Sequence, residues 1–269
     1  MTAADALALL RLQVEWGADE ALDERPYDRL AAAAPAVRPV SGPVIEAIRP
    51  AAAVSSPREN DSVPVLPLRG QARRAEDVAA AAGSIDLLRA ALVDFDGCSL
   101  RDTASHTLFA QGDAASGLLL VGEVPDADED RAGHAFAGPA GILLDRMLAS
   151  IGLSRDRILI TPLIPWRPPG DRKVSPIEMA ACLPFLHRLL VLAQPRYVVL
   201  MGVRPTRALL GPDASLGRLR GRWLPVAVPG SPQPVQALPM RHPGHLLANP
   251  PSRRDAWHDL LLLHGAMDR

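Results

Sequence analysis

Four short apolar runs alternate with helix-like segments in the C-terminal part of the chain, and this alternation is the strongest constraint on its fold. The runs have the length of strands and lie at Leu118 to Val121, Arg157 to Thr161, Arg196 to Met201 and Val235 to Met240. Strands that alternate with helices favour a mainly parallel sheet with helices on both faces. The sequence therefore predicts a three-layer α/β/α domain around a central, mainly parallel four-stranded sheet.

Helices are expected between and around these strands. They cover Ala75 to Leu92, Gly138 to Ile151, Pro176 to Ala193, Arg204 to Leu210 and a last segment near Arg254 to His264. In sheets of this kind the ligand sits in the crevice outside the carboxyl ends of the strands. The residues directly after each strand are therefore the ones to examine for chemistry.

The N-terminal part of the chain has a different composition. Residues 1–30 contain an apolar, leucine-rich segment that ends at Trp16 and predicts an amphipathic helix. Residues 31–74 are rich in Ala and Pro, with seven prolines between Ala31 and Gly70, which is typical of an extended or disordered linker. The α/β domain is expected to occupy residues 75–269.

Charge is distributed unevenly along the chain. The formal net charge is −1, but residues 151–269 carry 16 basic and 7 acidic side chains, a net of +9. A basic half is suited to contact with nucleic acid phosphates. Two cysteines, no signal-peptide pattern and no apolar run of membrane-spanning length lead to the expectation of a cytoplasmic, monomeric protein that does not contact a membrane.

Polar residues follow the first and the last predicted strand. Gly122 and Glu123 come directly after the first, and His242, followed by Pro243, comes after the last. A carboxylate at a strand end can orient a water molecule, and a fixed histidine can donate a hydrogen bond to a leaving group. The chain has no GxGxxG and no phosphate-loop lysine motif, so a nucleotide-binding loop is not indicated.

Several longer motifs resemble the uracil-DNA glycosylase superfamily, in particular its family four, the iron–sulfur type of bacteria and archaea. The motifs are GEVPDADED with GHAFAGPAGILLD between Gly122 and Asp145, TPLIPWRPPGDR from Thr161 to Arg172, a CxPxL-like pattern from Cys182 to Leu186, LRGRW from Leu219 to Trp223, and the His242-Pro243-Gly244 triplet. They occur in the family's order between about residues 94 and 264.

The resemblance implies a DNA repair enzyme that extrudes a deaminated base from DNA and hydrolyses its N-glycosidic bond. Glu123 matches the acid that positions the attacking water, and His242 matches the histidine that stabilises the departing base. Phe136 matches the aromatic residue that stacks on the base, with Gly122 and Glu129 as further members of the base-binding loop. The resemblance also implies that four arginines face phosphate, namely Arg167, Arg172, Arg220 and Arg222.

Two departures from the family pattern concern the base. The asparagine that reads the edge of uracil falls at Pro162, which has neither a polar side chain nor a backbone N–H. The last glycine of the first motif is Asp126. Uracil excision is therefore less strongly indicated than the fold.

The cluster positions also depart from the pattern. The family's four ligand positions fall at 95, 98, 166 and 182, where this chain has Phe95, Cys98, Trp166 and Cys182. Because a cubane cluster takes four ligands, commonly thiolates, the sequence predicts that the iron–sulfur cluster is absent and that the two aromatic residues fill its volume.

Three functions stay open at this stage: a DNA glycosylase, a catalytically impaired DNA-binding homologue, and a scaffold that recruits a repair partner through residues 1–30. Structural roles are also open for the site residues, since Glu123 can be a turn or cap carboxylate and Phe136 can be part of the core. His242 and His245 lack a third ligand, so a metal site is not expected.

Overall fold

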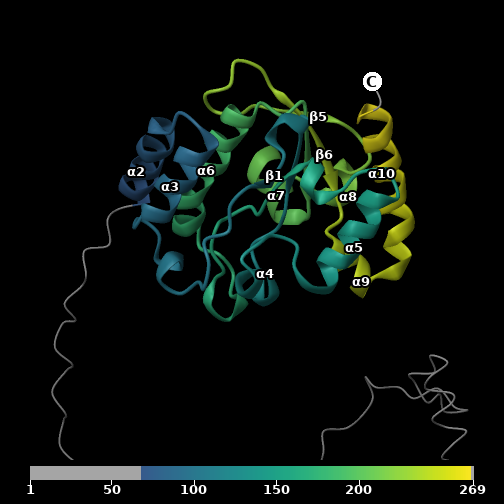
Figure 1. The fold of residues 1–269 in the computed structure, drawn as a ribbon, viewed down its shortest axis with the longest axis horizontal. Helices are drawn as coiled ribbons and strands as arrows, with labels where there is room; N and C mark the ends of the chain where they lie inside the picture. The colour runs from purple at the N-terminus through teal and green to yellow at the C-terminus, as the bar shows by residue number, and fades with distance from the viewer. Residues whose placement is uncertain (1–67, 268–269) are drawn as a thin grey trace, which may run out of the picture. The chain divides into compact units, whose positions relative to one another are not determined.

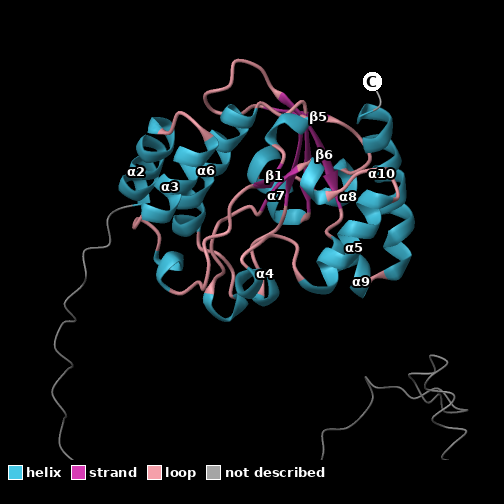
Figure 2. Ribbon diagram, viewed as in Figure 1, coloured by secondary structure: helices cyan, strands magenta, loops and turns pink. Residues whose placement is uncertain are grey.

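A six-stranded sheet forms the centre of residues 68–267, which the computed structural model describes (Figure 2). Its strand order is β1-β3-β2-β4-β6-β5, with the inner strands parallel and both edge strands antiparallel. The strands are β1 (Gln111–Gly112), β2 (Leu118–Val121), β3 (Leu159–Thr161), β4 (Tyr197–Met201), β5 (Leu224–Val226) and β6 (Val235–Met240). The four predicted parallel strands are thus confirmed, and the short strands β1 and β5 extend the sheet at its edges.

Helices cover both faces of this sheet, as expected for a three-layer α/β/α domain (Figure 1). One face carries α2 (Leu68–Ala81), α3 (Ile85–Asp94) and α6 (Pro176–Ala193), and the other carries α5 (Gly138–Ala149), α9 (Pro243–Ala248) and α10 (Arg253–Met267). The shorter helices are α4 (Ala127–Ala132), α7 (Val203–Leu210) and α8 (Leu216–Leu219). Short 3-10 helices occur at Ser99–Asp102, Ala114–Ser116, Arg155–Arg157, Pro169–Asp171 and Pro250–Ser252.

The strands are apolar throughout because both of their faces are buried. Along β2, Leu119 and Val121 pack into the core beneath α6, whereas Leu118 and Leu120 pack into the core beneath α5 and α10. A strand buried on both faces has no polar side to alternate with the apolar one. This explains why the strands appear in the sequence as continuous apolar runs.

The helix expected from Ala75 to Leu92 is instead two helices, and the first begins earlier. Helix α2 starts at Leu68, so residues 68–74, assigned to the linker from sequence, are helical. The chain breaks at Gly83, and Ser84 caps α3 by accepting the Leu87 N–H at 3.2 Å. The small side chains of Ala75 and Ala79 allow α2 to pack closely on α6. Residues 1–30 and 31–67, with the predicted helix and the rest of the linker, lie outside the described residues.

Helix α6 is long and apolar enough to cross a membrane by length and composition alone. In this fold it is a core helix: Ala181, Phe185 and Leu189 are buried against the sheet, and α2 and α3 pack along it. Its apolar composition therefore follows from contacts within the domain.

An ion pair joins the α8 region to α10. The Arg220 guanidinium donates to both oxygens of Asp259, at 2.8 and 3.0 Å, and also to the backbone carbonyl of Asp255. Asp259 is fully buried, and this burial raises its pKa to about 6 despite the neighbouring Arg220. Removal of one partner of a buried pair leaves an uncompensated charge.

We expect Arg220→Ala to lower the free energy of unfolding by about 3 kcal/mol near pH 8. At pH 5 the loss should be smaller, because a carboxyl whose pKa is about 6 is mostly protonated there and needs no partner. Urea denaturation at both pH values measures this. Arg222→Ala is the control, since Arg222 is exposed and, among residues 68–267, donates only to the Arg218 carbonyl. Equal losses in the two variants would contradict the assignment.

Candidate active site

Glu123 lies at the carboxyl end of β2, where the backbone of β2 and β3 continues to pair. The Gly122 N–H donates to the Thr161 carbonyl at 2.8 Å, and the Leu163 N–H donates to the Glu123 carbonyl at 3.2 Å. The Glu123 side chain is 19% exposed, and its Oε1 accepts the Arg204 backbone N–H at 3.1 Å. Burial raises the pKa of this carboxyl, while the Arg204 N–H and guanidinium act in the opposite direction.

The residue before α7 is a glycine for a steric reason. Gly202 has a φ of +123°, and a Cβ built on it would lie 2.1 Å from the Glu123 Oε1. Any other residue would therefore displace the carboxylate as well as strain the backbone. The end of β4 and the start of α7 thus form the surface on which the Glu123 carboxylate rests.

Phe136 has a left-handed backbone with a φ of +54°, which is uncommon outside glycine. Its N–H donates to the Glu129 Oε1 at 2.5 Å, and its carbonyl accepts the Arg155 Nη2 at 2.7 Å. The ring is 1% exposed and lies directly over Gly122, where a Cβ would come within 3.0 Å of it. The Phe136 ring is therefore part of the core beneath α5 and α10, the structural role left open for it from sequence.

Glu129 fixes both ends of the loop between Asp126 and Phe136. Its Oε2 accepts the Asp126 N–H at 2.9 Å and its Oε1 accepts the Phe136 N–H, so both oxygens are bonded to backbone groups. Its side chain is buried, and burial is the main reason that its pKa is raised to about 7. In the structure Glu129 positions the loop between Asp126 and Phe136 and forms the capping box of α4.

Asp126 has a local role in the same capping box. Its Oδ1 accepts the N–H groups of Asp128 and Glu129 at 2.9 and 3.0 Å. An aspartate is among the preferred N-cap residues, so the substitution of the family glycine supports the start of α4. The side chain is nevertheless close enough to His242 for its negative charge to raise the pKa of that histidine.

His242 ends the turn after β6 and caps α9. The Gly244 N–H donates to its Nδ1 at 3.2 Å, so the neutral ring carries its proton on Nε2. Burial lowers the pKa of His242 to about 4, against a smaller opposing effect of Asp126. Above that pH the ring is neutral, and its Nε2–H is the donor that it can offer to a ligand.

The rings of Phe136 and His242 are stacked, with centroids 5.2 Å apart and planes 20° from parallel. Gly122, Phe136 and His242 are therefore in one cluster at the carboxyl ends of β2 and β6, and Glu123 follows Gly122 directly. The structure brings these four predicted residues together. Glu129 is linked to this cluster through its hydrogen bond with the Phe136 N–H.

Within residues 68–267 the four predicted DNA-binding arginines form no hydrogen bond or ion pair with the residues of this cluster, and three of them pair with carboxylates. Arg167 bonds Asp171 at 2.7 and 3.1 Å, and Arg172 bonds Glu178 at 2.5 and 2.9 Å, which holds the pKa of Glu178 down to about 2. Arg220 pairs with the buried Asp259. Arg222 is exposed, and its guanidinium donates to the backbone carbonyl of Arg218.

Pro162 is buried just after β3, in the wall between that strand end and α6. It borders a small void of about 10 Å³ together with Cys182 and Phe185. Its carbonyl accepts the Thr161 hydroxyl at 3.3 Å. The position that reads the base in the family therefore supplies a rigid apolar surface here.

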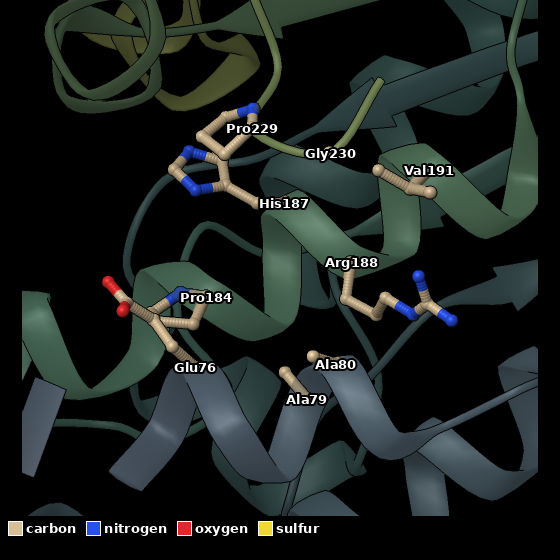
Figure 3. A pocket seen from close by; sticks show the side chains of 9 residues that line it. All are labelled: Glu76, Ala79, Ala80, Pro184, His187, Arg188, Val191, Pro229 and Gly230. Carbon is tan, nitrogen blue, oxygen red and sulfur yellow. The ribbon is translucent and has the colours of Figure 1, made fainter. Parts of the chain in front are cut away.

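A larger cavity of about 390 Å³ lies elsewhere, between α2 and α6 under the loop at Pro229 (Figure 3). Its charged or titratable lining residues are Glu76, His187 and Arg188. None of the predicted site residues lines it. The strand-end cluster, rather than this cavity, is the candidate active site.

An α/β domain with an acid, a neutral histidine and an aromatic ring at the ends of parallel strands belongs to the class of α/β proteins whose ligands bind at this edge of the sheet. The chain itself matches the uracil DNA glycosylase superfamily over residues 109–261 and belongs to that superfamily. Members of the superfamily related to this chain are DNA repair glycosylases, so DNA is the partner at the family level.

Three relatives are named type-4 uracil-DNA glycosylase. The protein of Pyrobaculum aerophilum is 32% identical over 179 residues, which are 65% of this chain and 90% of that protein. The Saccharolobus solfataricus protein is 30% identical over 176 residues, or 64% of this chain and 81% of that protein. The Archaeoglobus fulgidus protein is 32% identical over 162 residues, or 59% of this chain and 80% of that protein.

These relatives correct the expectation of no cofactor. They are of type 4, the iron–sulfur class, so the absence of a cluster predicted from Phe95 and Trp166 is wrong for the class to which the chain is similar. Among the described residues, no group of three or more His, Cys, Asp or Glu is placed to hold a metal ion. The Cys98 and Cys182 sulfurs lie 3.8 Å apart, and the two aromatic side chains are buried. Two thiols alone do not supply the four ligands of a cubane.

Three positioning residues were missed from sequence: Gly202 and Arg204 beside Glu123, and Arg155 beside Phe136. Arg155 donates to the carbonyls of Ala135 and Phe136 at 3.0 and 2.7 Å and also pairs with Asp145. An arginine after a helix has no distinctive local pattern. The glycine was a better signal, because it directly follows a strand and precedes a helix.

The buried Glu129 should make stability depend on pH. Because its folded pKa of about 7 lies above the usual 4.5, its favourable contribution is complete below about pH 4.5 and is lost as the pH rises through 7. The free energy of unfolding of the wild type, relative to that of Glu129→Gln, should therefore fall between pH 5 and pH 8. Asp128→Asn removes one charge from the same helix and is the control. The same pH dependence in both variants would show that Glu129 is not responsible.

Proposed function

We propose that this protein is a DNA glycosylase that hydrolyses the N-glycosidic bond of uracil or another deaminated base flipped out of DNA. The observation that carries the proposal is the strand-end cluster, in which the Nε2–H of His242 and the carboxylate of Glu123 flank a loop with an aromatic ring. The overall similarity to type-4 uracil-DNA glycosylases supports it.

Glu123 is the group that we assign to the water. An ionised carboxylate accepts a hydrogen bond from water and stabilises positive charge that develops on the sugar. The Arg204 backbone N–H and guanidinium favour the ionised form, although burial raises the pKa. The water oxygen bonds to C1′ as the bond from C1′ to the base nitrogen breaks, and the water proton passes to the carboxylate.

His242 is the group that we assign to the leaving base. The electron pair of the broken bond remains on the base as negative charge, which a hydrogen bond from the Nε2–H to a carbonyl oxygen of the base stabilises. Because burial keeps the ring neutral above about pH 4, His242 acts as a hydrogen-bond donor and is not expected to transfer its proton. The base takes up its proton after it leaves.

Phe136 is the stacking surface in this proposal, and His242 now occupies the space against its ring. A base that stacks on Phe136 therefore requires the two rings to separate. The strained backbone of Phe136, bonded on both sides by Glu129 and Arg155, keeps the ring in place while this happens. We further propose that Arg222, which has no carboxylate partner within residues 68–267, contributes positive charge toward the DNA backbone.

A second candidate is a DNA-binding homologue with impaired catalysis, and Pro162 is the observation that favours it. A proline cannot distinguish uracil from cytosine by hydrogen bonds, and each missing polar partner costs about 1 to 3 kcal/mol. This candidate keeps the fold and the basic surface. It differs from the first in a single measurable property, the formation of abasic sites.

The test is incubation of the full chain with single- and double-stranded oligonucleotides that carry uracil, hypoxanthine or xanthine, followed by alkaline cleavage at abasic sites. We expect product with at least one base, and a rate reduced by at least about 100-fold in Glu123→Gln. Glu76→Gln, an exposed acid on α2, is the control and should retain the rate. Tight binding without abasic product on any base would instead support the impaired homologue.

Pro162→Asn should restore a side chain that can donate to and accept from the edge of uracil. We expect the ratio of uracil excision to hypoxanthine excision to rise by about 5- to 100-fold, which corresponds to one recovered polar contact. Pro162→Ala removes the proline ring without adding an amide and is the control. A similar change of the ratio in both variants would mean that the amide does not read the base.

A further inference from the structure

An apolar groove of about 260 Å³ lies between α5 and α10, on the opposite side of the sheet from α6. Leu143 and Met147 line it from α5, Ala256 and Leu260 line it from α10, and Leu246 of α9 also contributes. Such a depression between two helices has the size and the lining of a site for one or two bulky apolar side chains.

Trp257 stands at this groove with 44% of its surface exposed. Its indole N–H has no acceptor within residues 68–267. Other large apolar side chains are exposed on the same three helices: Ile142 at 57%, Leu261 at 44% and Leu247 at 40%. Single exposed apolar residues are ordinary, but a tryptophan beside an apolar depression is typical of a protein-binding surface.

The charge at the groove is positive. Arg146 and Arg253 line it and are exposed, and Arg146 forms no ion pair among the described residues. The acidic side chains of the two helices are already engaged: Asp145 pairs with Arg155, Asp255 with Arg220 and Arg241, and Asp259 with Arg220. Within residues 68–267, neither arginine is therefore paired with a carboxylate.

We propose that this groove docks an acidic segment of a partner protein, which inserts a bulky apolar side chain between α5 and α10 and pairs its carboxylates with Arg146 and Arg253. Tryptophan and arginine are the residues most enriched at the energetic centres of such interfaces. The charge of the groove selects an acidic segment over a basic one.

A peptide fits these observations better than a nucleic acid strand. A nucleic acid strand would need cations spaced along its phosphates. This groove instead has two arginines beside an apolar floor. A segment that alternates apolar and acidic side chains matches both features at once.

The groove also lies on the helices that carry the candidate site. Helix α5 begins two residues after Phe136, and α9 is capped by His242. A partner held here would contact the outer sides of these helices and leave the strand ends accessible. The docking site therefore adds a recruitment function and does not depend on which base the protein excises.

The test uses the full chain and a fluorescein-labelled peptide of sequence Asp-Asp-Leu-Asp-Asp-Leu-Phe, with binding followed by fluorescence anisotropy at low and high salt. We expect saturable binding that weakens with salt and is at least about tenfold weaker in Trp257→Ala and in Arg146→Glu. Leu262→Ala and Arg207→Glu are the matched controls, because these side chains are exposed but do not line the groove.

Two further probes complete the design. A peptide with Asn in place of each Asp should bind at least about tenfold more weakly, and an oligothymidine strand should not compete for the groove. Absence of peptide binding up to a concentration on the order of 1 mM would overturn the proposal. So would unchanged affinity in Trp257→Ala, or competition by oligothymidine that depends on Trp257, which would make the groove a nucleic acid site.

Discussion

One buried carboxylate, that of Glu129, determines the shape of the candidate site. Its two oxygens accept the N–H groups at the start of α4 and at Phe136, and so fix both ends of the loop that follows β2. Together with the bond from Arg155 to the Phe136 carbonyl, these bonds hold Phe136 in a left-handed conformation, with its ring over Gly122 and against His242. The same carboxylate is costly to bury, which is why its pKa is raised to about 7. The site is thus built on a group that is itself under electrostatic strain.

The central strands and most helices could be predicted from sequence because they depend on local patterns. β2, β6 and α6 have the expected bounds, since each is a continuous apolar or helix-forming run with clear ends. The edge strand β1 has two residues, too few for any pattern, and exists because it pairs with β3. The break between α2 and α3 depends on a single cap at Ser84. Such features come from tertiary contacts and not from the residues alone.

The candidate site was predictable where family motifs exist and not where contacts are made at a distance. Gly122, Glu123, Phe136 and His242 are identified by motifs, and the fold brings them to one edge of the sheet. The contact of Arg204 with Glu123 joins residues 81 positions apart, and the bonds from Arg155 to the Phe136 loop are made by a side chain without a motif. Asp126 departs from the glycine of the family motif, and in the structure its side chain caps α4.

The contact between Gly202 and Glu123 has a consequence for how substitutions would distribute over this protein. An alanine at Gly202 would be strained by the φ of +123°, and the space that its methyl group needs is also taken by a carboxylate oxygen. Glu123 and Gly202 are therefore coupled, because a side chain added at Gly202 would displace the Glu123 carboxylate. In a survey of all single substitutions, Gly202 should be as intolerant as a residue with a chemical function. Intolerance at that position would then report on the backbone conformation and the packing around an acid and not on a direct part in the reaction.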